Sequence, residues 1–211
     1  MTRYLATLLF AFSAVALGSS GNISRVNGSI TVDSGQLAGD VATVNGSIAI
    51  GEDARVRDVE TVNGSIKILP RAQAQGVESV NGGITLEEDA QVAGEVSTVN
   101  GKLTLRRGAR IDGRLENVNG DLTLEGATVR GGLGTVNGDV LVGAGSRVEG
   151  GILVEKPHGW SWHGSGRLPR VTIEAGAVVE GTLRFEREVE LHVADGAVIG
   201  RVDGVAPRRV R

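Results

Sequence analysis

The tripeptide Val-Asn-Gly recurs seven times along the chain and restricts its fold more than any other feature. Successive copies lie 18 or 19 residues apart, and a fixed period of this length indicates a solenoid, in which each repeat forms one coil. Because Asn-Gly favours positive φ, each copy predicts a corner or tight turn between strands. The asparagines of the seven copies are Asn27, Asn45, Asn63, Asn81, Asn100, Asn119 and Asn137.

Aliphatic residues accompany every copy at three fixed offsets from its valine. One lies three residues before the valine, and two lie four and six residues after it. The last two alternate with an intervening residue and are often β-branched, which is typical of a strand with one buried face. The pattern predicts an all-β fold, a single-stranded parallel β-helix of about nine coils in which like side chains stack in ladders. At about 4.8 Å per coil, the rod would be on the order of 45 Å long.

The segment between one repeat and the next varies, with the common form Ala-x-Val-x-Gly-x-Val, as in residues 90–96. Asp, Glu, Arg and Gly crowd around it, so we expect a solvent-exposed corner there. After residue 18 the only aromatic residues are Trp160, Trp162 and Phe185, so small aliphatic side chains must fill the core. The 33 glycines argue against a helical protein, and the absence of cysteine excludes disulfides and thiolate metal sites.

Residues 1–18 have the pattern of a secretory signal peptide. Arg3 precedes an uncharged apolar run over residues 4–17, which ends in small residues suited to signal peptidase. The run is shorter than the roughly 20 residues of a bilayer span, although a retained anchor is the alternative interpretation. We therefore expect export to the periplasm or cell surface, no transmembrane span in the mature chain, and a single β-solenoid domain over residues 19–211.

A loop at 156–170 interrupts the repeat and contains both tryptophans. Trp160 and Trp162, flanked by His158 and His163, are candidates for stacking on a sugar ring or for binding a partner. The alternative is that the tryptophans fold back and cover apolar surface between coils. Two histidines are a poor basis for a metal site, which usually needs three or four ligands.

The seven asparagines predict a structural turn ladder, because stacked amides can hydrogen-bond along the axis of a stacked β structure. The chain lacks the Gly-Gly-x-Gly-x-Asp repeat that binds calcium. Apart from the offset shared by Asp121 and Asp139, acidic residues are scattered, which does not indicate an acid–base pair. Aliphatic residues such as Val26, Val32 and Ala38 fit the six-residue spacing of hexapeptide acyltransferases, but the three histidines come late in the chain. We expect no enzymatic activity, no metal and no cofactor.

Two runs near the C-terminus, residues 173–183 and 193–202, resemble bactofilin repeats. Bactofilins are polymer-forming bacterial cytoskeletal proteins with a short-coiled right-handed β-helix. The Asn-Gly coils are equally similar to bacterial putative adhesin-like β-solenoids. The resemblance implies a non-enzymatic envelope scaffold and no catalytic residues.

The sequence thus predicts an exported structural or interaction protein of the bacterial cell envelope, which acts as a self-associating scaffold. The alternative is a carbohydrate-binding or carbohydrate-acting β-helix that uses the Trp160/Trp162 loop. The formal net charge of −3 gives no electrostatic case for nucleic-acid binding. The candidate partners are other copies of the chain and an envelope glycan or protein.

The end coils decide where copies of the chain would meet, because their unpaired N–H and C=O groups can pair with another strand. Residues 19–22 are too few for a helical cap before the first coil, whereas Pro207 and the arginines after it protect the other end. We expect a homo-oligomer formed through the N-terminal coil.

Overall fold

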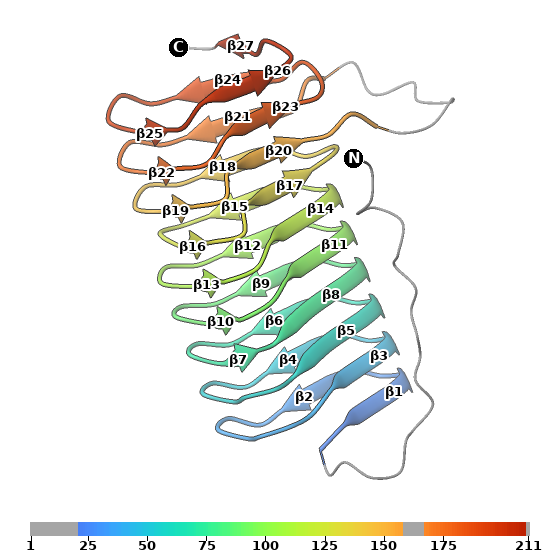
Figure 1. Ribbon diagram of the computed structural model, residues 1–211. Coiled ribbons are helices and arrows are strands. Elements are labelled where there is room, and N and C mark those ends of the chain that lie inside the picture. Colours follow the sequence, from blue (N-terminus) through green and yellow to red (C-terminus); the bar gives the residue numbers. More distant parts are fainter. Residues whose placement is uncertain (1–20, 158–166, 210–211) are drawn as a thin grey trace.

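The computed structural model describes residues 21–157 and 167–209. These residues form an all-β solenoid of about nine coils, with three parallel sheets along its length and no helix in the described ranges (Figure 1). The predicted all-β parallel β-helix is therefore confirmed.

The first sheet has ten strands and carries the residues that lead into each Val-Asn-Gly. Its strands are in parallel register, so that Val41 pairs with Ile23 on one side and Val59 on the other, and this aliphatic ladder faces the core. In order across the sheet the strands are β1 (Ile23–Asn27), β3 (Val41–Asn45), β5 (Asp58–Asn63), β8 (Gly76–Asn81), β11 (Val96–Asn100), β14 (Leu115–Asn119), β17 (Leu133–Thr135), β20 (Ile152–Val154), β23 (Leu183–Phe185) and β26 (Val202–Gly204).

The second sheet follows the Val-Asn-Gly corner and also has ten strands. In β6, Ile66 and Ile68 are buried while Lys67 is exposed, as the alternation of aliphatic residues predicts. The strands are β2 (Ile30–Val32), β4 (Ile48–Ile50), β6 (Ile66–Ile68), β9 (Ile84–Leu86), β12 (Leu103–Leu105), β15 (Leu122–Leu124), β18 (Val140–Val142), β21 (Arg170–Ile173), β24 (Glu190–Val193) and β27 (Arg208–Arg209).

The variable segment forms a third sheet of seven two-residue strands, where a solvent-exposed corner was expected. Ala90 and Val92 are fully buried, whereas Gln91 between them and the preceding turn, with Glu88 and Asp89, are exposed. The expectation was wrong for the Ala-x-Val part, because two inward residues are too few to give a periodic signal. The strands are β7 (Gln73–Ala74), β10 (Gln91–Val92), β13 (Arg110–Ile111), β16 (Thr128–Val129), β19 (Arg147–Val148), β22 (Val178–Val179) and β25 (Val198–Ile199).

Positive φ was the expected reason for the glycine of the Val-Asn-Gly corner, but the structure shows a different one. Of the seven glycines in these corners, only Gly28 and Gly120 have positive φ. At Gly64, a Cβ atom would lie 2.0 Å from the carbonyl oxygen of Gly46 in the preceding coil, a distance that no side chain tolerates. The tripeptide recurs mainly because the stacked backbones approach closely at this corner.

A buried polar ladder runs beside this corner. The residue before the valine faces inward, and Thr43, Thr61, Ser79 and Thr98 are all nearly fully buried. Each hydroxyl donates to the carbonyl oxygen of the corner glycine one coil earlier. The distances are 3.2 Å to Gly28, 3.0 Å to Gly46, 3.3 Å to Gly64 and 3.0 Å to Gly82, respectively.

The hydroxyl ladder becomes irregular in the sixth and seventh coils. Asn117 occupies the next position and donates to the carbonyl oxygen of Gly120 in its own coil. That oxygen is the one that Thr135 would use, and the Thr135 hydroxyl and Asn117 Oδ1 are both buried without a hydrogen-bond partner. In the following coils the position is taken by the buried apolar residues Val154 and Phe185.

Candidate functional site

The seven asparagine side chains form one hydrogen-bonded row along the Val-Asn-Gly corner. From the second coil onward, each Nδ2 donates to the Oδ1 of the asparagine one coil earlier, at 2.9–3.1 Å. All the amides therefore point the same way along the axis. The interior asparagines use both atoms of the amide within the row, which leaves little capacity there for binding a ligand.

Arg187 closes the row at its C-terminal end. Its Nη1 donates to Asn137 Oδ1 at 3.1 Å and to the carbonyl oxygen of Val136 at 3.4 Å. Asn137 thus has its amide nitrogen in the row and its amide oxygen on a guanidinium. Sequence reasoning missed Arg187, because it lies 50 residues from Asn137 and beyond the insertion.

A second row of side chains follows the asparagines, at the residue after each corner glycine. Ser29 and Ser47 accept hydrogen bonds from the backbone N–H of the equivalent residue one coil later, at 3.3 and 3.4 Å. Asp121 does the same for Asp139 at 3.2 Å. The shared offset of the two aspartates therefore belongs to an inter-coil contact, and a carboxylate engaged in this way is poorly placed for acid–base chemistry.

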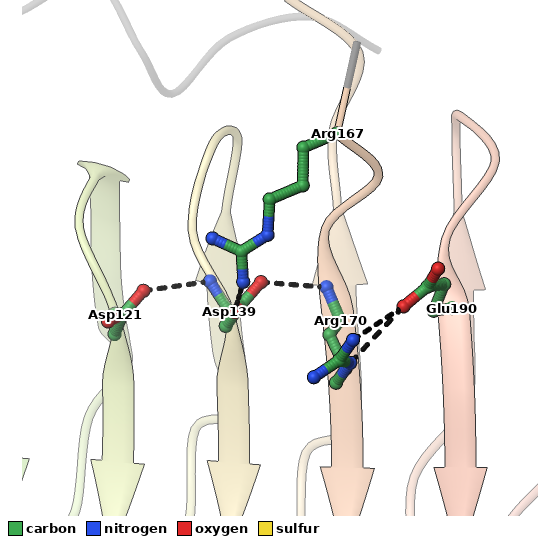
Figure 2. Close-up of polar contacts among 5 residues, drawn as sticks. All are labelled: Asp121, Asp139, Arg167, Arg170 and Glu190. Atoms are coloured by element: carbon green, nitrogen blue, oxygen red, sulfur yellow. Dashed lines mark hydrogen bonds and ion pairs between the residues drawn. The ribbon is translucent and has the colours of Figure 1, made fainter. Parts of the chain in front are cut away.

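Asp139 also anchors the base of the inserted loop, as Figure 2 shows. One oxygen accepts from the backbone N–H of Arg170 at 2.9 Å, and the other forms an ion pair with Arg167. The Arg170 guanidinium in turn contacts Glu190 at 3.0 Å in the next coil. The C-terminal end of the insertion is thereby held against the corner, and β21 re-enters the second sheet in register with β18.

The predicted loop residues His158, Trp160, Trp162 and His163 lie outside the described residues. The structure therefore describes only the base of the loop. Sugar stacking by the tryptophans and their folding back over the coils both stay predictions. The base itself supplies two arginines and one aspartate, Arg167, Arg170 and Asp139, all of them at least partly solvent-accessible.

Carboxylates line the outer face of the first sheet. Glu60 and Glu78 are half-buried and directly paired in register, and Glu95 precedes the next strand. Burial raises the pKa of all three, and neighbouring carboxylates raise it further: Glu78, Asp58 and Asp40 act on Glu60, and Asp58 acts on Glu78. None of the three forms an ion pair with another described residue. This stripe is a destabilising feature at neutral pH.

A groove of about 770 Å³ follows the opposite corner, between the second and third sheets. Its lining alternates in sign from coil to coil, with Glu87 and Glu88 followed by Arg106 and Arg107 and then by Glu125. Glu87 pairs with Lys67 at 2.9 Å, and Arg106 pairs with Glu125. Because most of these charges are neutralised between coils, the groove has no strong field of one sign.

The same corner holds a left-handed residue in each coil. Asp53 has φ 58° there, and a hydrogen bond from Arg71 lowers its pKa. The ion pair joins adjacent coils, since Arg71 is the equivalent residue of the next coil. In these two coils the acidic residues Glu52 and Asp53 are therefore explained by their contacts with Arg71.

Within residues 21–157 and 167–209, no three His, Asp or Glu side chains gather in a way that could hold a metal ion. No helix in those ranges is long and apolar enough to span a membrane. Comparisons of the chain with family models, with curated proteins and with solved structures give no match. The likeness to a β-helix protein is therefore one of architecture, and no family is assigned.

Proposed function

We propose that the chain is a non-enzymatic structural or interaction protein, a β-solenoid scaffold that is exported to the bacterial cell envelope and associates with copies of itself. The proposal extends to a polymer-forming, bactofilin-like or adhesin-like role. It is supported by three continuous parallel sheets, of which the two ten-stranded ones end in strands with one edge unpaired among the described residues.

The distribution of exposed apolar side chains carries the proposal. Among the described residues, four large hydrophobic side chains are exposed, and they lie in the end coils. Val26 and Leu37 are 61% and 72% exposed in the first coil, and Val198 and Val205 are 57% and 44% exposed in the last. Between the end coils no large hydrophobic side chain of the described residues is exposed, so the large apolar contacts are available at the ends of the stack.

The two ends differ in how well they are closed. In the first coil Ile30 and Val32 are buried, and the inward position of Thr43 is taken by Arg25, whose guanidinium donates to the carbonyl oxygen of Ser29 at 2.8 Å. A charged residue at an inward position discourages edge pairing.

The last coils leave their interior more open. Val193, Ala197, Ile199 and Val202 are only partly buried there, against Ile23 and Ala38 in the first coil. The sequence predicts contact through the N-terminal coil. The incomplete burial of core side chains in the last coils instead favours the C-terminal coil as the stronger interface.

Matched pairs of lysine substitutions at the exposed valines and leucine distinguish the ends. The chain without residues 1–18 would be studied by analytical ultracentrifugation and negative-stain microscopy, beside Val198→Lys/Val205→Lys and Val26→Lys/Leu37→Lys variants. We expect the parent chain to form dimers or filaments, and the C-terminal variant to be monomeric with an unchanged circular dichroism spectrum. A parent chain that stays monomeric at high micromolar concentration refutes self-association. If only the Val26→Lys/Leu37→Lys variant is monomeric, the interface lies at the first coil.

A carbohydrate-binding role for the inserted loop is the second candidate. It is supported by the firm attachment of the loop base, since Asp139 contacts residues Arg167 and Arg170 at once. Binding to a glycan array that is abolished in a Trp160→Ala/Trp162→Ala variant would favour it. Absence of binding in the parent chain, with filaments seen by microscopy, would favour the scaffold.

A further inference from the structure

The seven Val-Asn-Gly corners share a chemical weakness, because glycine after asparagine leaves the backbone nitrogen free to attack the side-chain amide. Attack by the glycine nitrogen on Cγ forms a five-membered succinimide and expels the amide nitrogen as ammonia. The fold determines how available that nitrogen is at each corner. Seven identical tripeptides therefore act as internal controls for one another.

Six of the seven glycine nitrogens are engaged in hydrogen bonds. Each donates its N–H to the carbonyl oxygen of the asparagine one coil later, from Gly28 at 2.8 Å through to Gly120 at 3.4 Å. In the interior coils the attacked amide is also fixed by its two neighbours in the row, as at Asn81, which is bonded to Asn63 and Asn100. Reaction at such a corner requires several hydrogen bonds to break first.

At the seventh corner the amide of Asn137 is also held, by Asn119 and Arg187, but the glycine nitrogen lacks its hydrogen bond. Gly138 has no hydrogen bond from its backbone nitrogen to any described residue, because the inserted loop begins where the next Val-Asn-Gly would stand. The amide oxygen of Asn137 accepts from the Arg187 guanidinium, which polarises the carbonyl and stabilises negative charge that develops on its oxygen. Gly138 is buried, but no hydrogen bond holds its nitrogen, and the amide that this nitrogen would attack is polarised by Arg187.

We propose that Asn137 is a deamidation site, at which the native protein converts to aspartate or isoaspartate while the interior corners stay intact. The Gly138 nitrogen bonds to Asn137 Cγ, the Cγ–Nδ2 bond breaks, and the proton of Gly138 leaves with the amide nitrogen as ammonia. Water then opens the succinimide at either carbonyl. The product carboxylate faces Arg187 and has no N–H to donate to Asn119 Oδ1, so the last hydrogen bond of the row is lost.

Peptide mapping by mass spectrometry of the purified chain, aged at neutral pH in heavy-oxygen water, tests this assignment. We expect Asn137 to incorporate the label at least about ten-fold faster than Asn63, Asn81 and Asn100, which corresponds to the loss of one or two hydrogen bonds at the interior sites. In concentrated urea the rates at the four sites should converge, because their tripeptides are identical.

An Arg187→Gln variant tests the activating group. The rate at Asn137 should fall several-fold, with the interior sites unchanged. Equal native rates at Asn137 and Asn81, or a preference for Asn137 that persists in urea, overturns the assignment. An unchanged or faster rate at Asn137 in the variant overturns the role of Arg187.

Discussion

Replacing Thr43, Thr61 and Thr98 together by valine tests the buried hydroxyl ladder. Valine has nearly the same shape as threonine, so the substitution removes the hydroxyl without opening a cavity. Each removal leaves the carbonyl oxygen of a corner glycine without the donor that now reaches it at 3.0–3.2 Å. All three threonines are at most 3% exposed, so water cannot readily replace the donor.

The expected loss follows from two opposing terms. A buried carbonyl left unpaired costs about 1–3 kcal/mol. Exchanging a hydroxyl for a methyl group in the core raises the free energy of unfolding by roughly 0.8 kcal/mol. Taking about 2 kcal/mol for the first term, each site loses about 1.2 kcal/mol, and the three together lose about 3 to 4 kcal/mol.

Urea unfolding followed by circular dichroism measures the loss as a shift of the midpoint at constant slope. The matched control replaces Thr31, Thr85 and Thr104 by valine, since these threonines stand on the outer face of the second sheet. The control should change the free energy of unfolding by less than about 1 kcal/mol in total. Equal shifts in the two triple variants would show that the inward hydroxyls do not stabilise the solenoid.

Three other predictions use the same unfolding measurement. Gly82→Ala should prevent normal stacking, because its Cβ would lie 1.9 Å from the carbonyl oxygen of Gly64; a native-like midpoint would contradict this. At the left-handed position of Asp89, a glycine variant should be more stable than an alanine variant by about 1 kcal/mol, and the reverse order would refute the backbone argument. Burial and Asp58 raise the pKa of Glu78 in the folded chain, so this carboxyl favours folding at pH values below its unfolded pKa, and that contribution is lost as the pH rises through the folded value. Glu78→Gln should therefore stabilise the protein by a few tenths of a kcal/mol at neutral pH and by nothing near pH 4, whereas a gain that grew on acidification would reverse the sign.

The repeat predicted the features of the fold that recur identically in every coil. The three aliphatic offsets mark positions such as Val41, Ile48 and Ile50, which are fully or almost fully buried. The third sheet escaped prediction because Ala90 and Val92 are small, are separated by one residue and are surrounded by charged residues. A signal was present, since in most coils an alanine is followed two residues later by another aliphatic residue, but these strands are too short to show a period of two.

The polar parts of the site depend on contacts between coils that a sequence displays only indirectly. Alternation along residues 41–45 places Thr43 on the same face as Val41, yet a hydroxyl at an inward position is satisfied by a backbone carbonyl, which no side-chain pattern reveals. The asparagine row needed only the repeat, because stacked identical residues must meet. Arg187 could not be placed, since the insertion shifts the register by an amount that the sequence does not state.

The change of sequence after Val154 has a physical cause that unites these features. A row of amides and a ladder of hydroxyls each need a partner in the next coil, so both must be closed where the repeat stops. Arg187 closes the amide row, while Val154 and Phe185 replace the hydroxyls by apolar side chains that need no partner. The junction is imperfect, with the Thr135 hydroxyl unpaired. The inserted loop leaves the stack just after the coil where both ladders end, so it interrupts no hydrogen bond between Val-Asn-Gly corners.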